Sequence, residues 1–562
     1  MKSRVLGALF LAGVMSTAGP AFPAQQQAHE DIYNAVATPD SGAAPANVPV
    51  YAPPQGVVRF SSGPFITHPG GGFGGADASV LQQAAGMTIF GFTASSAAAI
   101  RLADDFVVPA GQSWRVNQII VYAYQTNAIV TNPSPISAAN IQIWNGVPEA
   151  AGSTIVFGDL TTNRLVSSTF SNVYRALEST PLNAARGAWA NRVSIGQTFG
   201  PGTYWIDWQV TGSPAFGGPF VPPVTILGTL DTGNAMQKVG TAAFVALLDG
   251  THPQGIPFLL LGPRPAALAI SGGNTNGVIE PAETVGVEPA WRGGVIADTN
   301  VTGTAVGNAD FVLTDLAAAY GTLPIDTVAS CTAATNCYAG TAGATRPTTH
   351  WDAAMTETLT NGDVWVWPLH IGASFTDVPT TNIFYRFVET ILHRNVTGGC
   401  TTTTYCPGAS TTREQMSVFV LVSKDPLAAP PAACVAGSER FTDVPASSPF
   451  CRWIEELERR GVVTGCTANT YCPTAPASRE QMSVFVLRTL DPTLNPPACA
   501  PPNLYTDVPE TSPFCRWIEE LTVRGVVTGC GGGNYCPTAD VTRDQMAVFL
   551  TGTFSLTLYG PS

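Results

Sequence analysis

Phe441-Thr-Asp-Val-Pro445 is one of three copies of a short motif, and the spacing of the copies decides the fold of the last third of the chain. The other copies begin at Phe375 and Tyr505, so the starts lie 66 and then 64 residues apart (441 − 375 and 505 − 441). A period of this length is the signature of tandem structural repeats. The sequence therefore predicts three similar units between Phe375 and Leu550.

Each unit contains two segments with helical spacing, separated by a Thr-Gly turn and a loop that ends Tyr-Cys-Pro. In the middle unit, Ser448-Pro449 has the pattern of an N-cap and a first helical residue, and Gly461 marks the helix end. The second segment opens with the capping box Ser478-Arg-Glu-Gln481, and Thr412 to Gln415 and Thr542 to Gln545 repeat this start. One helix-loop-helix of this size cannot bury its own core, whereas three can share one.

The units resemble the S-layer homology repeat through Phe441 to Val444, Gly461-Val-Val-Thr-Gly465, Tyr471-Cys-Pro473 and Ser478-Arg-Glu480. The resemblance assigns residues 373–425, 434–491 and 499–554 to three consecutive copies. It implies a compact, three-lobed, all-α module. It also implies that this module attaches exported proteins to cell-wall glycans, which are often acidic polymers bearing pyruvate.

Three arginines are the candidate glycan-binding residues, because each lies one residue after a predicted N-cap: Arg413, Arg479 and Arg543. A helix start offers free N–H groups to an anion, and a guanidinium can hold a carboxylate with two hydrogen bonds. The alternative is structural, with each arginine paired to a nearby acid. On the glycan hypothesis, replacing all three with Gln abolishes wall binding and leaves the melting temperature nearly unchanged. The aspartates of the three motifs are interpreted as structural and two tryptophans as core residues (Asp377, Asp443, Asp507; Trp453, Trp517).

The twelve cysteines predict six disulfides, since their number is even and the chain has the features of an exported protein. Four pairs have five residues between the partners, and two pairs join a Pro-rich linker to the first helix of its unit. The pairs are Cys331–Cys337, Cys400–Cys406, Cys434–Cys451, Cys466–Cys472, Cys499–Cys515 and Cys530–Cys536. In the first unit Tyr385 replaces the helix cysteine and the linker cysteine is missing too, as expected for a bonded pair. Zinc is the competing interpretation, but the cysteines lack zinc-ligand spacing, so no metal site is predicted.

The first 75 residues have the layout of a targeting segment and a linker. Residues 1–24 contain Lys2 and Arg4, an apolar run and then small residues, which predicts a secretory signal peptide. Residues 25–75 are rich in Ala, Pro, Gly and Gln, which predicts a flexible lead-in. No later segment reaches the length of a membrane helix.

The middle of the chain predicts two β domains. Short alternating apolar runs between turn residues predict a jelly-roll-like β-sandwich over residues 76–262. An immunoglobulin-like β domain is predicted over residues 268–372. Its start, Asn274 to Glu283, resembles the first strand and turn of bacterial surface modules. The Asn and Glu oxygens there are candidate calcium ligands, against the alternative of a plain turn.

The chain offers little evidence for catalysis. It lacks the Gly-x-Ser-x-Gly, His-Glu-x-x-His, phosphate-loop and dinucleotide motifs, so neither an enzyme nor a cofactor is predicted. The six histidines are scattered, and His350-Trp-Asp352 is interpreted as structural. A net charge of −13 and a pI near 4.9 argue against nucleic acid as a partner.

We therefore expect an exported envelope protein that displays β domains and binds cell-wall polysaccharide through the three repeats. The alternative is a secreted carbohydrate-binding or adhesive protein, whose β-sandwich holds the ligand while the repeats serve as a disulfide-stapled scaffold. In that alternative Trp205 and Trp208 are candidates for stacking on sugars, although their spacing along one strand places at least one of them in the core.

Overall fold

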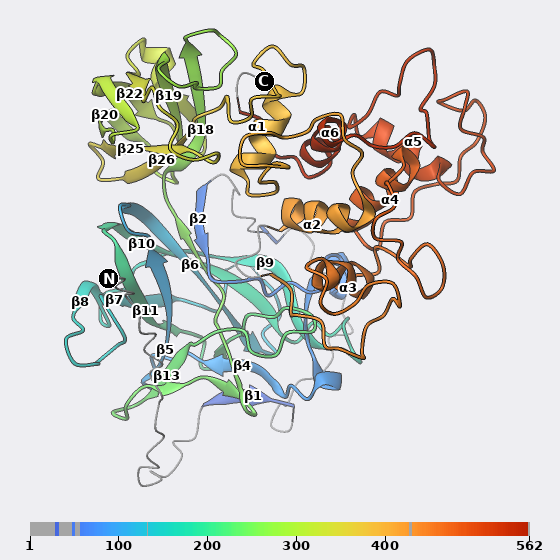
Figure 1. The fold of residues 1–562 in the computed structure, drawn as a ribbon. Coiled ribbons are helices and arrows are strands. Elements are labelled where there is room, and N and C mark those ends of the chain that lie inside the picture. Colours follow the sequence, from blue (N-terminus) through green and yellow to red (C-terminus); the bar gives the residue numbers. More distant parts are fainter. Residues whose placement is uncertain (1–27, 33–47, 51–56, 132, 426–429, 560–562) are drawn as a thin grey trace, which may run out of the picture. The chain divides into compact units, whose positions relative to one another are not determined.

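The computed structural model describes residues 28–32, 48–50, 57–131, 133–425 and 430–559. The predicted signal peptide, residues 1–24, lies outside the described residues. The chain divides into two compact units, one ending at Gly262 and one beginning at Pro263, except that Gly111–Arg115 joins the second unit. Each unit is described separately below (Figure 1).

The first unit is a β structure with two main sheets. One sheet has the order β1-β4-β12-β6-β10-β9-β3, with β17 pairing both β6 and β2, and the other has the order β14-β13-β5-β11-β7-β8. The strands are β1 (His29–Asp31), β2 (Val58–Ser61), β3 (Asp77–Leu81), β4 (Ile89–Thr93), β5 (Ile100–Val108), β6 (Trp114–Thr126), β7 (Ala138–Trp144), β8 (Ile155–Asp159), β9 (Leu165–Leu177), β10 (Gly187–Phe199), β11 (Gly202–Thr211), β12 (Gly217–Val221), β13 (Met236–Val239), β14 (Val245–Ala246), β15 (Leu248–Asp249), β16 (His252–Pro253) and β17 (Phe258–Leu261). Two short 3-10 helices, η2 (Phe73–Gly75) and η3 (Gln83–Ala85), complete the unit.

The two main sheets pack against each other through aromatic rings, which gives the expected sandwich. Phe60 on β2 lies 6.2 Å from Phe106 on β5, measured between ring centroids. Central strands are covered on both faces, so β6 is buried along nearly its whole length. Within the predicted flexible lead-in, residues 25–75, the structure differs from the prediction at β1 and β2, because β1 pairs with β4 and β2 with β17. Residues 25–27, 33–47 and 51–56 of this range lie outside the described residues.

The second unit begins with a smaller β domain. Its sheets have the orders β18-β19-β24-β21, with β23 beside β19, and β22-β20-β25-β26. The elements are β18 (Arg264–Gly272), β19 (Thr284–Arg292), β20 (Asp298–Val306), β21 (Phe311–Asp315), β22 (Ala317–Leu323), β23 (Val328–Ser330), η4 (Cys331–Ala334), β24 (Tyr338–Ala342), β25 (Asp352–Leu359) and β26 (Val364–His370). The carboxylate of Glu357 is fully buried in this domain and accepts hydrogen bonds from two tryptophans and two tyrosines (Trp291, Trp367, Tyr320, Tyr338).

Six helices form the rest of this unit. They are α1 (Tyr385–His393), α2 (Arg413–Lys424), α3 (Cys451–Arg459), α4 (Arg479–Leu490), α5 (Cys515–Val523) and α6 (Arg543–Thr553). Helices α2, α4 and α6 contact one another, and each first helix packs on the second helix of the preceding repeat: α3 on α2, α5 on α4 and α1 on α6. Residues from all three repeats share one apolar core, as the sequence predicted.

The starts of the first helices differ from the prediction. Helix α3 begins at Cys451 and not at Pro449. The Ser448 hydroxyl accepts a hydrogen bond from the N–H of Phe450 (3.2 Å), and the N–H of Cys451 donates to the Ser448 carbonyl (3.1 Å). The Ser-Pro pair therefore forms a turn that leads into the helix.

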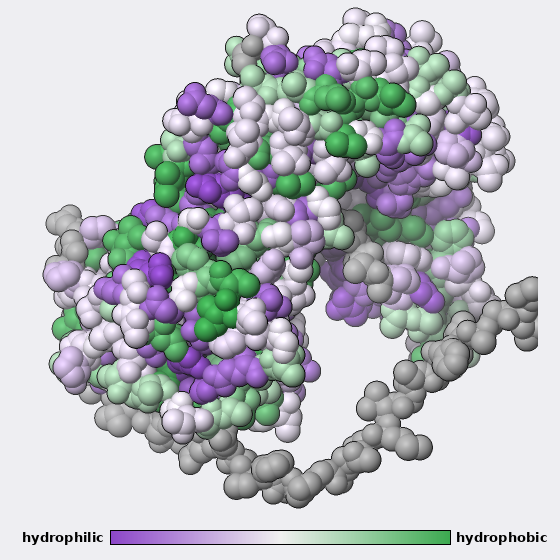
Figure 2. All heavy atoms as spheres, turned by 90° about the vertical axis from the view of Figure 1, so that its left-hand side faces the viewer, coloured by the Kyte–Doolittle hydropathy of each residue, from purple (hydrophilic) through white to green (hydrophobic). Residues whose placement is uncertain are grey.

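On the face shown in Figure 2, hydrophobic and hydrophilic residues are interspersed in small patches. Single exposed apolar residues are normal for a folded protein. Among the described residues visible in that view, the apolar residues form small separate patches and no extended apolar surface.

Candidate functional site

The Tyr-Cys-Pro loop of each repeat is held by the aspartate of its own aromatic motif. In the middle repeat, the Asp443 carboxylate accepts hydrogen bonds from the N–H groups of Tyr471 (2.8 Å) and Cys472 (2.7 Å). The Gly465 turn before the loop has a φ of 92°, and a Cβ there would lie 2.5 Å from the Thr470 carbonyl oxygen. Asp377 and Asp507 make the matching bonds in the other repeats. The three aspartates are therefore structural, as interpreted from the sequence.

Each candidate arginine lies at a seam between two repeats and makes a reciprocal contact with the tyrosine of the neighbouring loop. The Arg413 Nε–H donates to the Tyr471 carbonyl (2.9 Å), and the Tyr471 hydroxyl donates to the Arg413 carbonyl (2.9 Å). The guanidinium also lies over the tyrosine ring, 4.7 Å from its centroid. The same contacts join Arg479 with Tyr535 and Arg543 with Tyr405.

These three seams close the repeats into a ring. Repeat one reaches repeat two through Arg413, repeat two reaches repeat three through Arg479, and repeat three returns to repeat one through Arg543. The backbone closes the same ring in the opposite direction: the N–H of Thr411 donates to the carbonyl of Val541, that of Val541 to Ala477 and that of Ala477 to Thr411, each at 2.9 Å. The ring is the feature that places the three arginines at equivalent positions.

The N–H groups at the helix starts are not free, so the premise of an open anion site there is wrong. The N–H groups of Arg413 and Glu414 donate to the carbonyls of Ala475 and Pro473 (2.9 Å each), and the other two helices repeat this arrangement. The capping box forms fully in α2, while in α6 the Asp544 carboxylate accepts from the N–H of Gln545. The seams thus satisfy the backbone groups that were expected to bind a glycan.

The guanidinium groups themselves are largely buried but still reach the surface. Arg413, Arg479 and Arg543 are 7%, 8% and 6% exposed, and burial lowers the pKa of Arg413. Within the described residues, Nε supplies the hydrogen bond of the Arg479 side chain, and its two terminal nitrogens have no partner there. A guanidinium held in this way by Nε has its outer edge available for a carboxylate. The role of the three arginines in glycan binding stays a prediction.

All six predicted disulfides are confirmed: Cys331–Cys337, Cys400–Cys406, Cys434–Cys451, Cys466–Cys472, Cys499–Cys515 and Cys530–Cys536. In the first repeat Tyr385 occupies the position of the helix cysteine and binds the β domain. Its hydroxyl donates to Glu280 (2.9 Å) and accepts from the N–H of Ala373 (2.7 Å). The missing disulfide is thus replaced by a contact between the module and the domain before it.

The candidate calcium ligands form a closed turn. The carboxylate of Glu280 accepts from the side-chain amides of Asn274 (2.8 Å) and Asn276 (2.7 Å), and Glu283 accepts from the N–H groups of Asn274 and Glu280. These oxygens therefore accept hydrogen bonds within the turn, which favours the alternative of a structural turn.

For two sets of residues, the structure differs from what the sequence predicted. Trp205 and Trp208 are 5% and 1% exposed, because β11 lies between β5 and β7 with both faces covered, so neither can stack on a sugar. Conversely, the structure brings His350-Trp-Asp352 together with His370 and His393, which the sequence did not predict. The two-residue spacing of His350 and Asp352 was the available signal, because it places both side chains on one side of an extended chain.

Among the described residues, the helices are all too short or too polar to cross a membrane.

Residues 440–483 and 504–547 match the family model of the S-layer homology domain. A segment of 107 residues, 19% of this chain, is 30% identical to an endoglucanase from Bacillus sp. (strain KSM-635). The chain covers 11% of the length of that relative. The C-terminal part of the chain, where the six helices lie, therefore contains S-layer homology domains.

Proposed function

We propose that this protein is a cell-envelope protein that the three-repeat module anchors without a covalent bond to cell-wall glycan, and that the β domains are the displayed part. The observation that carries the proposal is the closed ring, in which the two matched S-layer homology domains and the first repeat share one core and equivalent seams. S-layer homology domains typically bind cell-wall polysaccharide. The match therefore supports the envelope as the location, and export is part of the proposal.

The seams are the proposed glycan contacts, and an acidic polymer is the proposed ligand. Each seam has one arginine whose Nε holds the next repeat. One terminal nitrogen of Arg413 donates to Gln481 and one of Arg543 to Thr397 (3.4 Å each), whereas the outer edge of Arg479 has no partner within the described residues. Such an edge suits a carboxylate better than a neutral hydroxyl, since a bond to an ionised acceptor is roughly twice as strong. Three equivalent seams favour a repeating polymer, because each further contact becomes intramolecular once the first has formed.

The test is retention on purified cell walls. The full chain and a chain ending at Gly372 are incubated with walls of the source organism, before and after acidic polymers are stripped with mild acid. We expect the full chain to be retained, to be released by stripping or by high salt, and the shortened chain to remain in solution. Equal retention of both chains would refute the proposal, and retention that salt and stripping leave unchanged would refute its acidic part.

A second candidate function is carbohydrate binding by the first β unit, and one observation favours it. An open hollow of about 400 Å³ is lined by Ile129 and Phe216, which are 66% and 37% exposed, beside the polar side chains of Asn127 and Thr131. Apolar walls with a few polar groups are typical of ligand sites. Affinity electrophoresis in gels that contain soluble glycans tests this function by comparing Phe216→Ala with the unmodified chain. Equal mobility of the two chains in every glycan would refute carbohydrate binding at this hollow.

The proposed function includes no catalytic step. Hydrolysis of soluble cellulose derivatives by the full chain tests this point, because the similarity to an endoglucanase names that substrate class. Release of reducing sugar above a boiled control would overturn the non-enzymatic part and leave the anchoring part in place.

A further inference from the structure

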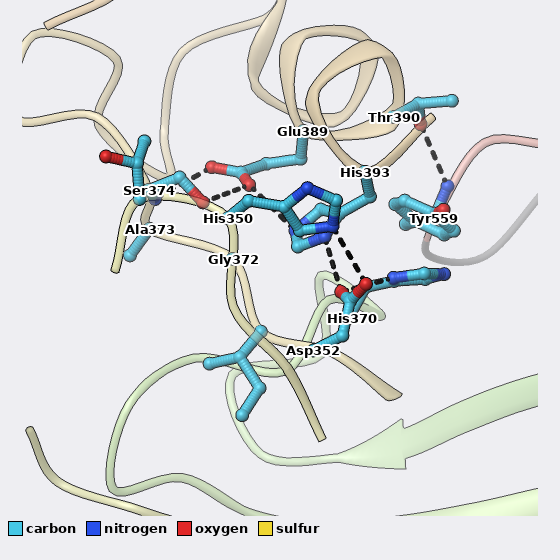
Figure 3. A network of polar contacts seen from close by, with 12 residues as sticks. His350, Asp352, His370, Gly372, Ala373, Ser374, Glu389, Thr390, His393 and Tyr559 are labelled. Carbon is cyan, nitrogen blue, oxygen red and sulfur yellow. Dashed lines mark hydrogen bonds and ion pairs between the residues drawn. The ribbon is translucent and has the colours of Figure 1, made fainter. Parts of the chain in front are cut away.

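Three histidines from separate segments of the second unit surround the carboxylate of Asp352, the first residue of β25 (Figure 3). His350 Nε2 lies 2.8 Å from Oδ2, while His370 Nδ1 and His393 Nδ1 lie 2.7 Å and 2.6 Å from Oδ1. His350 precedes β25, His370 ends β26 and His393 ends α1. The cluster therefore joins the small β domain to the first repeat.

His393 is the unusual member of this cluster. Its side chain is completely buried, and among the described residues neither ring nitrogen has a partner with hydrogen-bond geometry. Nδ1 faces Asp352 and Nε2 lies 3.6 Å from the Glu389 carboxylate. Buried polar atoms are nearly always satisfied, and a cation bound at Nδ1 would satisfy this nitrogen together with the carboxylate that faces it.

We propose that His350 Nε2, His393 Nδ1 and the Asp352 carboxylate bind one divalent transition-metal ion of the zinc class. The three ligand atoms lie within 4.8 Å of one another. A tetrahedral zinc site with bonds of about 2.0 to 2.1 Å separates its ligand atoms by about 3.3 Å, so small side-chain rotations suffice. Two imidazole nitrogens select zinc, copper or nickel over calcium and magnesium, which prefer oxygen ligands.

The groups around these ligands have the arrangement that orients metal-binding residues. Glu389 is fully buried, accepts from the N–H (2.9 Å) and hydroxyl (2.7 Å) of Ser374, and faces His393 Nε2. A carboxylate in that position accepts the Nε2 proton and thereby leaves the Nδ1 lone pair directed at the ion. His370 also faces Asp352. Its Nδ1 lies 2.7 Å from Oδ1, the same carboxylate oxygen that His393 Nδ1 approaches. The cluster therefore contains both ligands and the residues that would orient them.

Two other groups of metal-ligand residues in the described chain do not compete. Each combines two cysteines with a glutamate: Cys434, Cys451 and Glu455, and Cys499, Cys515 and Glu519. The cysteines of each group are bonded to each other, so no thiolate is available. Of these groups in the described chain, the histidine cluster is therefore the one whose ligand atoms are all available to a metal ion.

The ion would link the β domain to helix α1, because His350 and Asp352 come from the former and His393 from the latter. Bound metal stabilises the state that has the site preformed. The expected effect is slower amide exchange in Tyr385–His393 when the ion is present. Tyr385, which replaces the cysteine of the other repeats, lies in the same helix.

The experiment uses the full, non-reduced chain, freed of metal with a chelator, at pH 8. Zinc is titrated by calorimetry, and cobalt is added separately to record its visible absorption. The variants are His350→Gln, which removes a partly exposed ligand, His393→Gln, and Glu389→Gln, which keeps every ligand. The matched control is His252→Gln, which removes a histidine paired with a single aspartate, Asp231, at 2.7 Å.

We expect one zinc per chain, at least a tenfold weaker affinity in His350→Gln and His393→Gln, and unchanged binding in the control. Glu389→Gln should weaken binding about 10- to 100-fold. Zinc should slow exchange in α1 of the unmodified chain and not of His350→Gln. Binding that His350→Gln leaves unaltered, or the absence of a zinc equivalent in the unmodified chain, overturns the proposal. Because His350 is partly exposed, its variant remains informative even if His393→Gln fails to fold.

Discussion

The seam arginines offer the sharpest test of the structure, because the sequence alone predicts that their loss leaves stability unchanged. We consider Arg479→Gln. The substitution removes the Nε–H bond to the Tyr535 carbonyl (2.9 Å) and the contact of the guanidinium with the rings of Tyr535 (4.7 Å) and Phe549 (5.7 Å). Glutamine is too short to reach the same carbonyl, so that oxygen loses its partner.

The two losses add to a measurable change. A hydrogen bond from a charged donor contributes about 1.5 to 3 kcal/mol. A cation–π contact that is largely shielded from water contributes about 1 to 2 kcal/mol. Release of the buried charge into water offsets part of the sum, which leaves a destabilisation of about 3 kcal/mol, or about a 100-fold rise in the exchange rate of the affected amides.

Hydrogen exchange followed by mass spectrometry measures this change within the full chain, where unfolding of several domains complicates a single melting curve. Faster exchange is expected in Arg479–Leu490 and in the Cys530–Cys536 loop. The control is Arg459→Gln, which removes the same charge from a side chain that is 70% exposed and paired with Glu456. If Arg479→Gln and Arg459→Gln raise exchange equally and by less than about threefold, the seam does not hold the repeats together.

Three further predictions follow from particular contacts. Tyr405→Phe removes the hydroxyl that closes the ring (2.7 Å to the Arg543 carbonyl), so exchange in α6 should rise by an amount equivalent to about 1 to 2 kcal/mol, and unchanged exchange would contradict the closure. Replacing both Cys434 and Cys451 with Ser opens a loop of sequence separation 17 and should lower the free energy of unfolding in urea by about 3 kcal/mol. A loss below about 1 kcal/mol would contradict a stabilising role for this disulfide. Burial raises the pKa of Glu280 to about 7, from an ordinary value of 4.5, so its contribution to folding is complete below pH 4.5 and is lost as the pH rises to 7. The unmodified chain should therefore lose about 2 to 3 kcal/mol of unfolding free energy between pH 4.5 and pH 8 that Glu280→Gln does not lose. An equal pH dependence of the melting temperature in the two chains would refute this.

The local features of the repeats could be predicted from the sequence because each depends on residues close together in the chain. The capping box of α2 requires Thr412 and Gln415, three residues apart, and it forms as expected. The loop disulfides have a sequence separation of 6, and they were paired correctly from the repeat pattern. Periodicity also identified the apolar stripes that meet in the shared core.

The contacts between repeats could not be predicted in the same way. The sequence shows that Arg413 and Tyr471 recur in every repeat, but not that the arginine of one repeat contacts the tyrosine of the next, 58 residues along the chain. The order in the ring depends on how three cores pack, which no local pattern encodes. The same reason explains why free N–H groups were expected at helix starts that the neighbouring loop covers.

The histidine cluster was missed for a related reason. The sequence analysis assigned His350 to the predicted β domain over residues 268–372 and His393 to the predicted repeat over residues 373–425. The two come together because α1 packs beside the end of β26. The strand that carries Trp205 and Trp208 was predicted correctly, but its sequence does not show that both of its faces are covered, so one tryptophan was left as a candidate for stacking on a sugar. Both errors come from treating neighbouring elements as independent.

Closure of the repeats also fixes their number. Each copy contributes one arginine to the following copy and one tyrosine to the preceding copy, so a ring of three leaves neither kind unmatched. A fourth copy added beside this ring would find every arginine and tyrosine of the three copies already matched, and deletion of one copy would leave one arginine and one tyrosine without the partners that it supplied. During evolution, the copies can therefore diverge in sequence at their outer surfaces far more readily than they can change in number.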